Sequence, residues 1–324
     1  MTDVLITVDT ELSALFQQRG KSAAANLASS IRGETQGGAF GVGWQMDRMD
    51  AHDLKGVFFV DPLPALVHGE GPIADIVGPI VARGHDVQLH IHTEWLEWAK
   101  QSPVGGRQGR FLADFTRADQ LVLLRLARDL IERAGAPRPI AFRAGNYGAN
   151  DDTLSALAEL GIGWDSSVNA DYLGGACRVD LGADRHMPVK HRGVIELPVS
   201  GLYDRPGHFR PAQICALSAW EMAAALRHSA HARHPVFTIV THSFEMLSRD
   251  RSRPNRSVMK RFEAMCRTIA QEPGLRTATF PDLDPVAVLV EEKPRLGPDR
   301  LRTWARLGEQ ALATWRYERQ LRPA

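Results

Sequence analysis

Four clusters of ionisable side chains follow runs of β-forming residues in this 324-residue chain. In the first cluster, Asp9 and Glu11 come directly after the apolar residues 4–8, and alternation places both carboxylates on one side of an extended chain. Two carboxylates this close repel each other unless a proton or a cation lies between them. One could therefore bind a metal while the other takes a proton from water, although a helix N-cap is the structural alternative.

The second cluster contains two histidines with strand spacing. His90 and His92 alternate along residues 87–92, so both imidazoles can face one point in space. Imidazole pairs are common ligands of zinc and similar divalent ions. We therefore predict a metal-binding role for this pair, whereas His85 at the start of the strand is expected to be structural.

The third cluster is the segment FRAGNYGAN at residues 142–150. Arg143 cannot lose its charge, so it can hold a carboxylate ionised and in place. Its glycines let the backbone approach a substrate, and an exposed amide near Tyr147 could stabilise an oxyanion. An ordinary turn would use the same residue types.

The fourth cluster begins with His242, directly after the apolar residues 236–240. A histidine at this position could donate a proton to a leaving amine. A core histidine with satisfied hydrogen bonds is an equally good explanation of His242 alone, and the four clusters together favour a catalytic site.

The elements that must position these clusters alternate between short strands and helices, which predicts a parallel sheet, open or closed into a barrel. The carboxyl ends of such strands form the functional edge in this class of fold. The expected strands are residues 4–8, 55–60, 87–92, 140–142, 162–164, 195–199, 236–240 and 276–280. The expected helices are residues 44–52, 73–82, 118–134, 151–160, 218–228 and 258–271, and residues 19–43 are expected to be loop with one helical turn.

The segment from residue 286 to 324 differs in character and is predicted to be a C-terminal helical extension of a domain spanning residues 1–285. Residues 300–320 combine arginine, leucine, alanine and tryptophan at helical spacing. A membrane-surface or partner-binding helix is one interpretation. A helix that packs on its own domain, or on a second subunit in a homo-oligomer, is the interpretation we favour.

The composition of the chain indicates which partners and which cellular compartment to expect. The formal charge of +1 gives no reason to expect a nucleic-acid partner, because phosphate binding needs a concentrated basic surface. The three widely spaced cysteines, Cys177, Cys215 and Cys266, suggest neither a disulfide framework nor a structural zinc site. No signal peptide and no transmembrane run is recognisable, so we expect a cytoplasmic protein.

The order of these motifs resembles that of the NodB-homology polysaccharide deacetylases, related to carbohydrate esterase family 4, over residues 3–285. ITVDTE at residues 6–11 is similar to the family's opening acidic motif, and KGVFFV at 55–60 to its second strand. GHDVQLH at 84–90 resembles the start of the family's histidine motif, and RAGNYG at 143–148 resembles its arginine motif. GIGWDSSV at 161–168 resembles the segment that commonly follows one helix later, and IVTH at 239–242 resembles the final motif.

Two positions depart from the family pattern. The family's second histidine normally stands four residues after the first, where this chain has Glu94, so either His92 or Glu94 completes the metal site. The adjacent acids of the family are spread here to Asp-x-Glu, so the roles of Asp9 and Glu11 could be exchanged. Some relatives with altered ligands hydrolyse amides without a metal.

The resemblance implies a distorted or incomplete (β/α) barrel of seven to eight strands and a carbohydrate N-deacetylase, which is an amide hydrolase. A divalent ion, with Zn²⁺ the expected one, would be bound by Glu11, His90 and His92. The catalytic residues it implies are Asp9 as base, Arg143 as its partner, the Tyr147 loop for the oxyanion, and His242 as acid with help from Asp165. The expected substrate is an N-acylated amino sugar or another small molecule. The alternatives are metal-independent hydrolysis of a small cyclic amide or ureide, and a relative that binds carbohydrate without catalysis.

Overall fold

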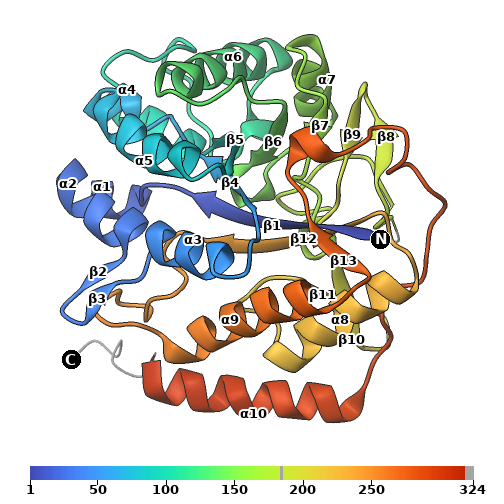
Figure 1. Cartoon of the computed structure of the whole chain (residues 1–324). Helices are drawn as coiled ribbons and strands as arrows, with labels where there is room; N and C mark the ends of the chain where they lie inside the picture. The colour runs from blue at the N-terminus through green and yellow to red at the C-terminus, as the bar shows by residue number, and fades with distance from the viewer. Residues whose placement is uncertain (183–184, 318–324) are drawn as a thin grey trace.

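A single mixed sheet organises the chain, of which the computed structural model describes residues 1–182 and 185–317. The strand order is β12-β1-β4-β5-β6-β7-β9-β8, and β13 pairs with the start of β1 (Figure 1). Neighbours from β12 to β9 are parallel and only β8 is antiparallel to its neighbour within this described sheet. The strands are β1 (Thr2–Thr10), β4 (Gly56–Val60), β5 (Asp86–Ile91), β6 (Ala141–Ala144), β7 (Trp164–Asp165), β8 (Val189–His191), β9 (Val194–Glu196), β12 (Val236–His242) and β13 (Leu275–Thr277).

Helices follow most strands and lie around the outside of the sheet (Figure 1). Their N-termini carry the expected caps: the side chains of Thr116, Ser218 and Asn255 accept backbone N–H bonds at the starts of α6, α8 and α9. Because both faces of the central strands are covered, β1 and β4 consist almost entirely of buried residues. The principal helices are α3 (Val42–Asp50), α5 (Gly71–Ala82), α6 (Arg117–Arg133), α7 (Asp151–Glu159), α8 (Ala219–His231), α9 (Arg256–Gln271) and α10 (Arg300–Tyr317).

The sheet is strongly curled. Arg143 on β6 bonds to Thr7 and Asp9 on β1, although β4 and β5 lie between these strands in the sheet order. Three strand spacings in a flat sheet would separate β6 from β1 by about 14 Å, which is beyond the reach of an arginine side chain. The contact therefore requires curvature, and among the described residues the end strands β12 and β8 do not pair with each other. The predicted incomplete barrel is confirmed, with eight strands along the path and β13 added beside it.

Several short elements were not expected from the sequence. Residues 19–43 contain α2 (Ala23–Asn26), a π-helical segment (Leu27–Arg32) and the hairpin of β2 (Glu34–Thr35) and β3 (Gly38–Ala39), where one helical turn was predicted. The buried Asn26 side chain stabilises this segment through bonds to the Ser13 backbone and to Ser30. A second unexpected hairpin joins β10 (Gly201–Arg205) to β11 (His208–Pro211). The remaining short elements are α1 (Ala14–Gln18), α4 (Ala65–His68) and 3₁₀ turns at Thr93–Trp98, Leu112–Asp114, Gly145–Tyr147, Ala170–Tyr172 and Phe280–Asp282.

The C-terminal helix α10 packs on its own domain, as one of the favoured interpretations predicted. Its buried Arg306 contacts Asp204 at 2.6 Å and Glu221 at 3.0 Å, and Glu309 contacts Arg261 of α9 at 2.6 Å. The last three residues of the helix predicted at 300–320 lie outside the described residues. The domain division at residue 285 stays a prediction. No helix in residues 1–182 and 185–317 is both long and apolar enough to cross a membrane.

Candidate active site

Asp9 and Arg143 form a buried ion pair at the carboxyl ends of β1 and β6. Nη1 of Arg143 lies 2.7 Å from Oδ1 of Asp9 and also donates to Oγ1 of Thr7 at 2.7 Å. The guanidinium donates to the backbone oxygen and the hydroxyl of Ser166, both at 3.1 Å, and stacks 4.4 Å from the ring centroid of Phe59. Arg143 is fully buried, so this network fixes the carboxylate of Asp9 in one orientation.

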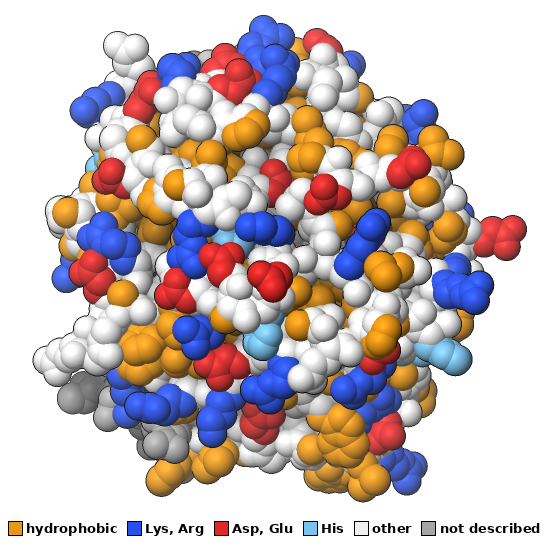
Figure 2. All heavy atoms as spheres, viewed as in Figure 1, with side chains coloured by type: hydrophobic (Ala, Val, Ile, Leu, Met, Phe, Trp, Pro, Cys, Tyr) orange, Lys and Arg blue, Asp and Glu red, His pale blue; other side chains and the backbone are white. Residues whose placement is uncertain are grey.

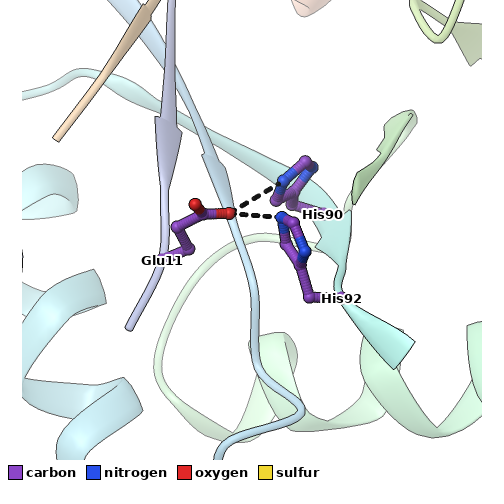
Figure 3. A group of neighbouring side chains, drawn as sticks. All are labelled: Glu11, His90 and His92. Carbon is purple, nitrogen blue, oxygen red and sulfur yellow. Dashed lines mark ion pairs between the residues drawn. The ribbon is translucent and has the colours of Figure 1, made fainter. Parts of the chain in front are cut away.

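Glu11, His90 and His92 converge beside this ion pair. One ligand atom from each residue lies within 4.8 Å of the others. Oε2 of Glu11 is 3.4 Å from Nε2 of His90 and forms a shorter ion pair with Nε2 of His92. Figure 3 shows the carboxylate, at the end of β1, pointing toward both imidazoles at the end of β5. The structure thus brings together the three residues that the sequence predicted as a metal site.

The outer nitrogen of each imidazole has its own partner. Nδ1 of His90 lies 2.7 Å from the backbone oxygen of Arg143, and Nδ1 of His92 lies 3.3 Å from Oε2 of Glu94. Asn146 in turn donates to Oε1 of Glu94 at 3.1 Å. Such contacts orient the rings and leave both Nε2 atoms facing Glu11, as in metal sites with carbonyl or carboxylate support. Glu94 therefore lies behind His92 and not within the three-residue cluster.

The electrostatics of the cluster suit a cation. Burial alone would raise the pKa of Glu11, but His92 and His90 outweigh it and hold that pKa well below its ordinary value. Burial would lower the pKa of His92, but Glu11 and Glu94 raise it well above its ordinary value. Oε2 of Glu11 is buried, and both imidazoles face it. A divalent ion would take over the charge compensation that the protonated imidazole provides, so the donor set fits such an ion.

A further buried carboxylate, Asp61, was missed by sequence reasoning. Its Oδ1 accepts a bond from the backbone of Leu63 at 3.0 Å, and its buried Oδ2 has no hydrogen-bond partner among the described residues. Burial raises the pKa of Asp61 to about 7, against the opposing effect of His92 and His90. Asp61 directly follows the strand at 55–60, so the rule that identified the other clusters would also have found it.

His242 lies opposite Asp9 in the register between β12 and β1. Its Nδ1 is 3.6 Å from Oε2 of Glu245, which also accepts bonds from the backbone of His242 and from Thr241. Burial would lower the pKa of His242, but Glu245 and then Asp9 raise it to about 9. Gln45 donates to the backbone oxygen of His242 at 3.0 Å and fixes the strand end. The arrangement keeps a proton on His242 at neutral pH.

Asp165 is placed differently from the expectation that it assists His242. It is fully buried on β7, and Ser167 donates to it from both its hydroxyl and its backbone. Burial raises the pKa of Asp165 and also that of the neighbouring Glu196, whose pKa the charge of Asp165 raises further. Burial thus disfavours the charged form of both carboxyl groups, and the carboxylate that lies beside His242 is that of Glu245.

The Tyr147 loop follows β6 and packs against the cluster of Glu11, His90 and His92. Gly145 is required here because an added Cβ would lie 2.5 Å from the backbone oxygen of Ile91 and 2.9 Å from the ring of His92. Asn146 and Tyr147 both have positive φ, at 54° and 58°. The buried hydroxyl of Tyr147 accepts a bond from Gln213 at 2.8 Å. Burial, and then the charge of Asp9, raise its pKa, so the phenol stays neutral.

Comparisons with known proteins support the fold expectation. No protein-family model and no curated protein sequence matches the chain. A solved structure from Mycobacterium smegmatis, assigned as a polysaccharide deacetylase, is similar with a TM-score of 0.56 and 17% identity, over 91% of this chain and 95% of that chain. The resemblance predicted from the motifs is thereby confirmed at the level of the fold.

A second solved structure shows that the fold alone does not identify the reaction. The 4-alpha-glucanotransferase of Thermococcus litoralis aligns with a TM-score of 0.53 and 11% identity, over 92% of this chain but 41% of that chain. The same arrangement of strands therefore occurs in proteins named for different reactions, and the reaction of this chain has to be argued from its own side chains.

Proposed function

We propose that the chain is a metal-dependent hydrolase that removes an acyl group, acetyl in the first instance, from an N-acylated amino sugar. One observation carries the proposal: the Asp9–Arg143 ion pair and the cluster of Glu11, His90 and His92 lie at the same edge of the sheet. This edge combines a fixed proton acceptor with a donor set for a divalent ion. The similarity of fold to a protein assigned as a polysaccharide deacetylase supports the reaction class.

Glu11, His90 and His92 are the proposed metal ligands, with Glu94 orienting His92. One carboxylate and two imidazoles suit Zn²⁺, which commonly has three protein ligands and one open position in catalytic sites. A bound ion of this kind polarises an acyl oxygen and lowers the pKa of a bound water toward about 7.

Asp9 is the proposed base. Its Oδ1 is held by Arg143, and its Oδ2 makes no hydrogen bond among the described residues, so Oδ2 is the atom proposed to accept the proton of water. Because Arg143 is locked by Thr7 and Ser166, it can hold Asp9 still during this transfer. Little reorganisation is then needed at the moment of reaction.

His242 is the proposed acid. A pKa of about 9 keeps it protonated at neutral pH, and its strand register opposite Asp9 supports base and acid acting from two sides of one substrate. Backbone amides of the Tyr147 loop are proposed to stabilise the oxyanion. For Asp165 we propose a structural role, because its hydrogen bonds go to Ser167.

The proposed substrate is a sugar intermediate in the cytoplasm, linked to a nucleotide or a lipid. Cys177, Cys215 and Cys266 are all free, and this supports a reducing compartment. A sugar of this kind would give the enzyme access to an N-acetyl group outside the mature cell wall.

The test is acetate release from N-acetylglucosamine, its 1-phosphate and its nucleotide-linked form, by protein incubated with Zn²⁺. Asp9→Asn should lower kcat by about 10²–10⁴-fold, the typical contribution of a positioned base. The matched control is Asp75→Asn, which changes an exposed aspartate on α5 and should leave kcat unchanged. If the wild type releases no acetate from any of these sugars, a cyclic amide or ureide hydrolase becomes the leading alternative, followed by a binding protein without catalysis.

We also propose that two copies of the chain associate through α10. The helix turns Arg306, Glu309 and Gln310 toward its own domain, whereas its outer face is apolar. Figure 2 shows hydrophobic side chains along the lower edge of the molecule, where α10 lies in Figure 1. The exposed fractions are 71% for Leu301, 70% for Trp304, 61% for Leu312 and 58% for Trp315.

The spacing of the residues on this apolar face favours a second copy of the chain, related by two-fold symmetry, over an unrelated partner. Trp304 and Leu312 stand four residues before and after Gly308, and Leu301 and Trp315 stand seven residues before and after it. In an antiparallel pair centred on Gly308, each tryptophan would therefore face a leucine of the second copy. A two-fold interface requires self-complementarity of this kind. A Cβ added at Gly308 would meet no atom within 4 Å, so this side of the helix is open and would allow the two helices to approach closely.

A further inference from the structure

A cavity of about 460 Å³ lies beside the proposed acid, outside the cluster that is proposed to bind metal. It is bounded by the loop after β12, the start of α9 and the second half of α10. The residues that give the cavity its chemistry are Phe244, Glu245, Arg249, Arg251, Arg261 and Gln310. Two of these, Phe244 and Glu245, are also the neighbours of His242, so the cavity adjoins the reaction site.

Arg251 is the residue of this cavity that most needs explanation. Its guanidinium lies between two aromatic rings, 4.1 Å from the centroid of Phe244 and 4.8 Å from that of Phe16. Its Nη1 donates to Oγ of Ser30 at 2.6 Å. Within the described residues, no carboxylate lies within ion-pair distance of Arg251, although burial lowers its pKa and only the more distant Glu11 opposes this effect. Arg251 is half-buried, and a partly desolvated charge without a counter-charge is unfavourable, so this position favours an anion supplied by a ligand.

The other charged groups of the cavity leave a positive excess. Arg261 is already paired with Glu309 at 2.6 Å, and Glu245 is occupied by Thr241 and His242. Arg249 is exposed and makes no hydrogen bond or ion pair in the described part of the chain. Arg249 and Arg251, separated by one residue, therefore line the same cavity, and their guanidinium groups have N–H donors that are not used in hydrogen bonds.

We propose that this cavity binds an anionic group of the substrate, a phosphate or a carboxylate, through Arg251 and Arg249. The proposal rests on the proposed function and narrows the substrate to an N-acylated sugar that carries a negative charge. Guanidinium groups match the geometry of phosphate and carboxylate oxygens. Because the ring of Phe244 is 5.5 Å from that of His242 and 4.1 Å from Arg251, one aromatic ring separates the anion from the proposed acid.

Binding can be measured separately from hydrolysis by isothermal titration calorimetry of the full chain incubated with Zn²⁺. The probes are N-acetylglucosamine 1-phosphate, N-acetylmuramic acid and neutral N-acetylglucosamine, which distinguish a phosphate from a carboxylate and both from no charge. The variants are Arg251→Gln, Arg251→Lys and Arg249→Gln. The matched control is Arg256→Gln, which removes an exposed arginine of the same region that does not line the cavity. Thermal melting of each variant verifies that it is folded.

We expect at least one charged sugar to bind ten-fold or more tightly than the neutral sugar, and Arg251→Gln to abolish this preference. Arg251→Lys should retain part of it, and Arg256→Gln should retain all of it. A wild type that does not distinguish charged from neutral sugars, or an Arg251→Gln variant with unchanged preference, would overturn the inference. Charged sugars that bind through Arg251 without releasing acetate would instead refute the proposed hydrolysis and leave this inference standing.

Discussion

The buried Asp9–Arg143 pair permits a stability test that does not depend on knowing the substrate. Replacing Arg143 with methionine retains most of the buried volume and removes the charge and its donors. Asp9 would then be a carboxylate with a side chain only 6% exposed and no cation at Oδ1. In the same change Thr7 would lose one hydrogen bond and Ser166 would lose two.

Removing one partner of a buried ion pair typically costs about 3–5 kcal/mol, because the other charge remains buried without compensation. The free energy of unfolding of a whole domain is about 5–15 kcal/mol, so Arg143→Met should remove a large share of it. Adding Asp9→Asn to Arg143→Met removes the uncompensated charge. The double variant should therefore be more stable than Arg143→Met alone, which is the reverse of simple additivity.

Urea unfolding followed by circular dichroism at pH 7 gives the four free energies of this double-mutant cycle. The control is Arg117→Met, which breaks the exposed pair with Glu159, a surface ion pair of the kind worth about 0–1 kcal/mol. If the Arg143 and Asp9 substitutions were additive within about 0.5 kcal/mol, the two groups would not be energetically coupled, and the argument that Arg143 holds Asp9 would be refuted.

Three other features give shorter tests. The raised pKa of Glu196 means that the folded state keeps a proton that the unfolded state loses above pH 4.5, so Glu196 makes wild-type stability fall as pH rises. Glu196→Gln should make the difference in stability between pH 5 and pH 8 smaller than in the wild type, as urea unfolding would show. Glu245→Gln should lower the pKa of His242 from about 9, so the decline of kcat/KM on the alkaline side should begin at a lower pH, and an unchanged profile would exclude His242 as the acid. Replacing Trp304 and Trp315 with serine should convert a dimer into a monomer in light scattering, whereas a monomeric wild type would contradict the association through α10.

The sequence predicted the functional edge well because each cluster directly follows an apolar β-forming run. The structure brings together Asp9, Arg143 and the three proposed metal ligands, which lie at or directly after the ends of β1, β5 and β6. Strand alternation and the meeting of parallel strand ends were enough for this prediction. The same rule applied to the strand at 55–60 would have added Asp61.

The remaining details depend on strand order, which periodicity does not contain. Asp165 was expected to assist His242, whereas in the structure Ser167 donates to it from both its hydroxyl and its backbone, a local contact that periodicity does not contain. Glu245, three residues after His242, has that position because the chain turns immediately after β12. The hairpin of β10 and β11 was missed for a different reason: its strands are short, and polar residues interrupt the alternation of apolar residues.

The most direct test of the central claim is the metal content of the purified protein after incubation with Zn²⁺ and removal of excess ion, measured by elemental analysis. We expect close to one equivalent in the wild type and in an Asp75→Asn control, and loss of the ion when His90 and His92 are both replaced by alanine. A wild type that retains no Zn²⁺ and no other divalent ion would contradict the metal-dependent mechanism.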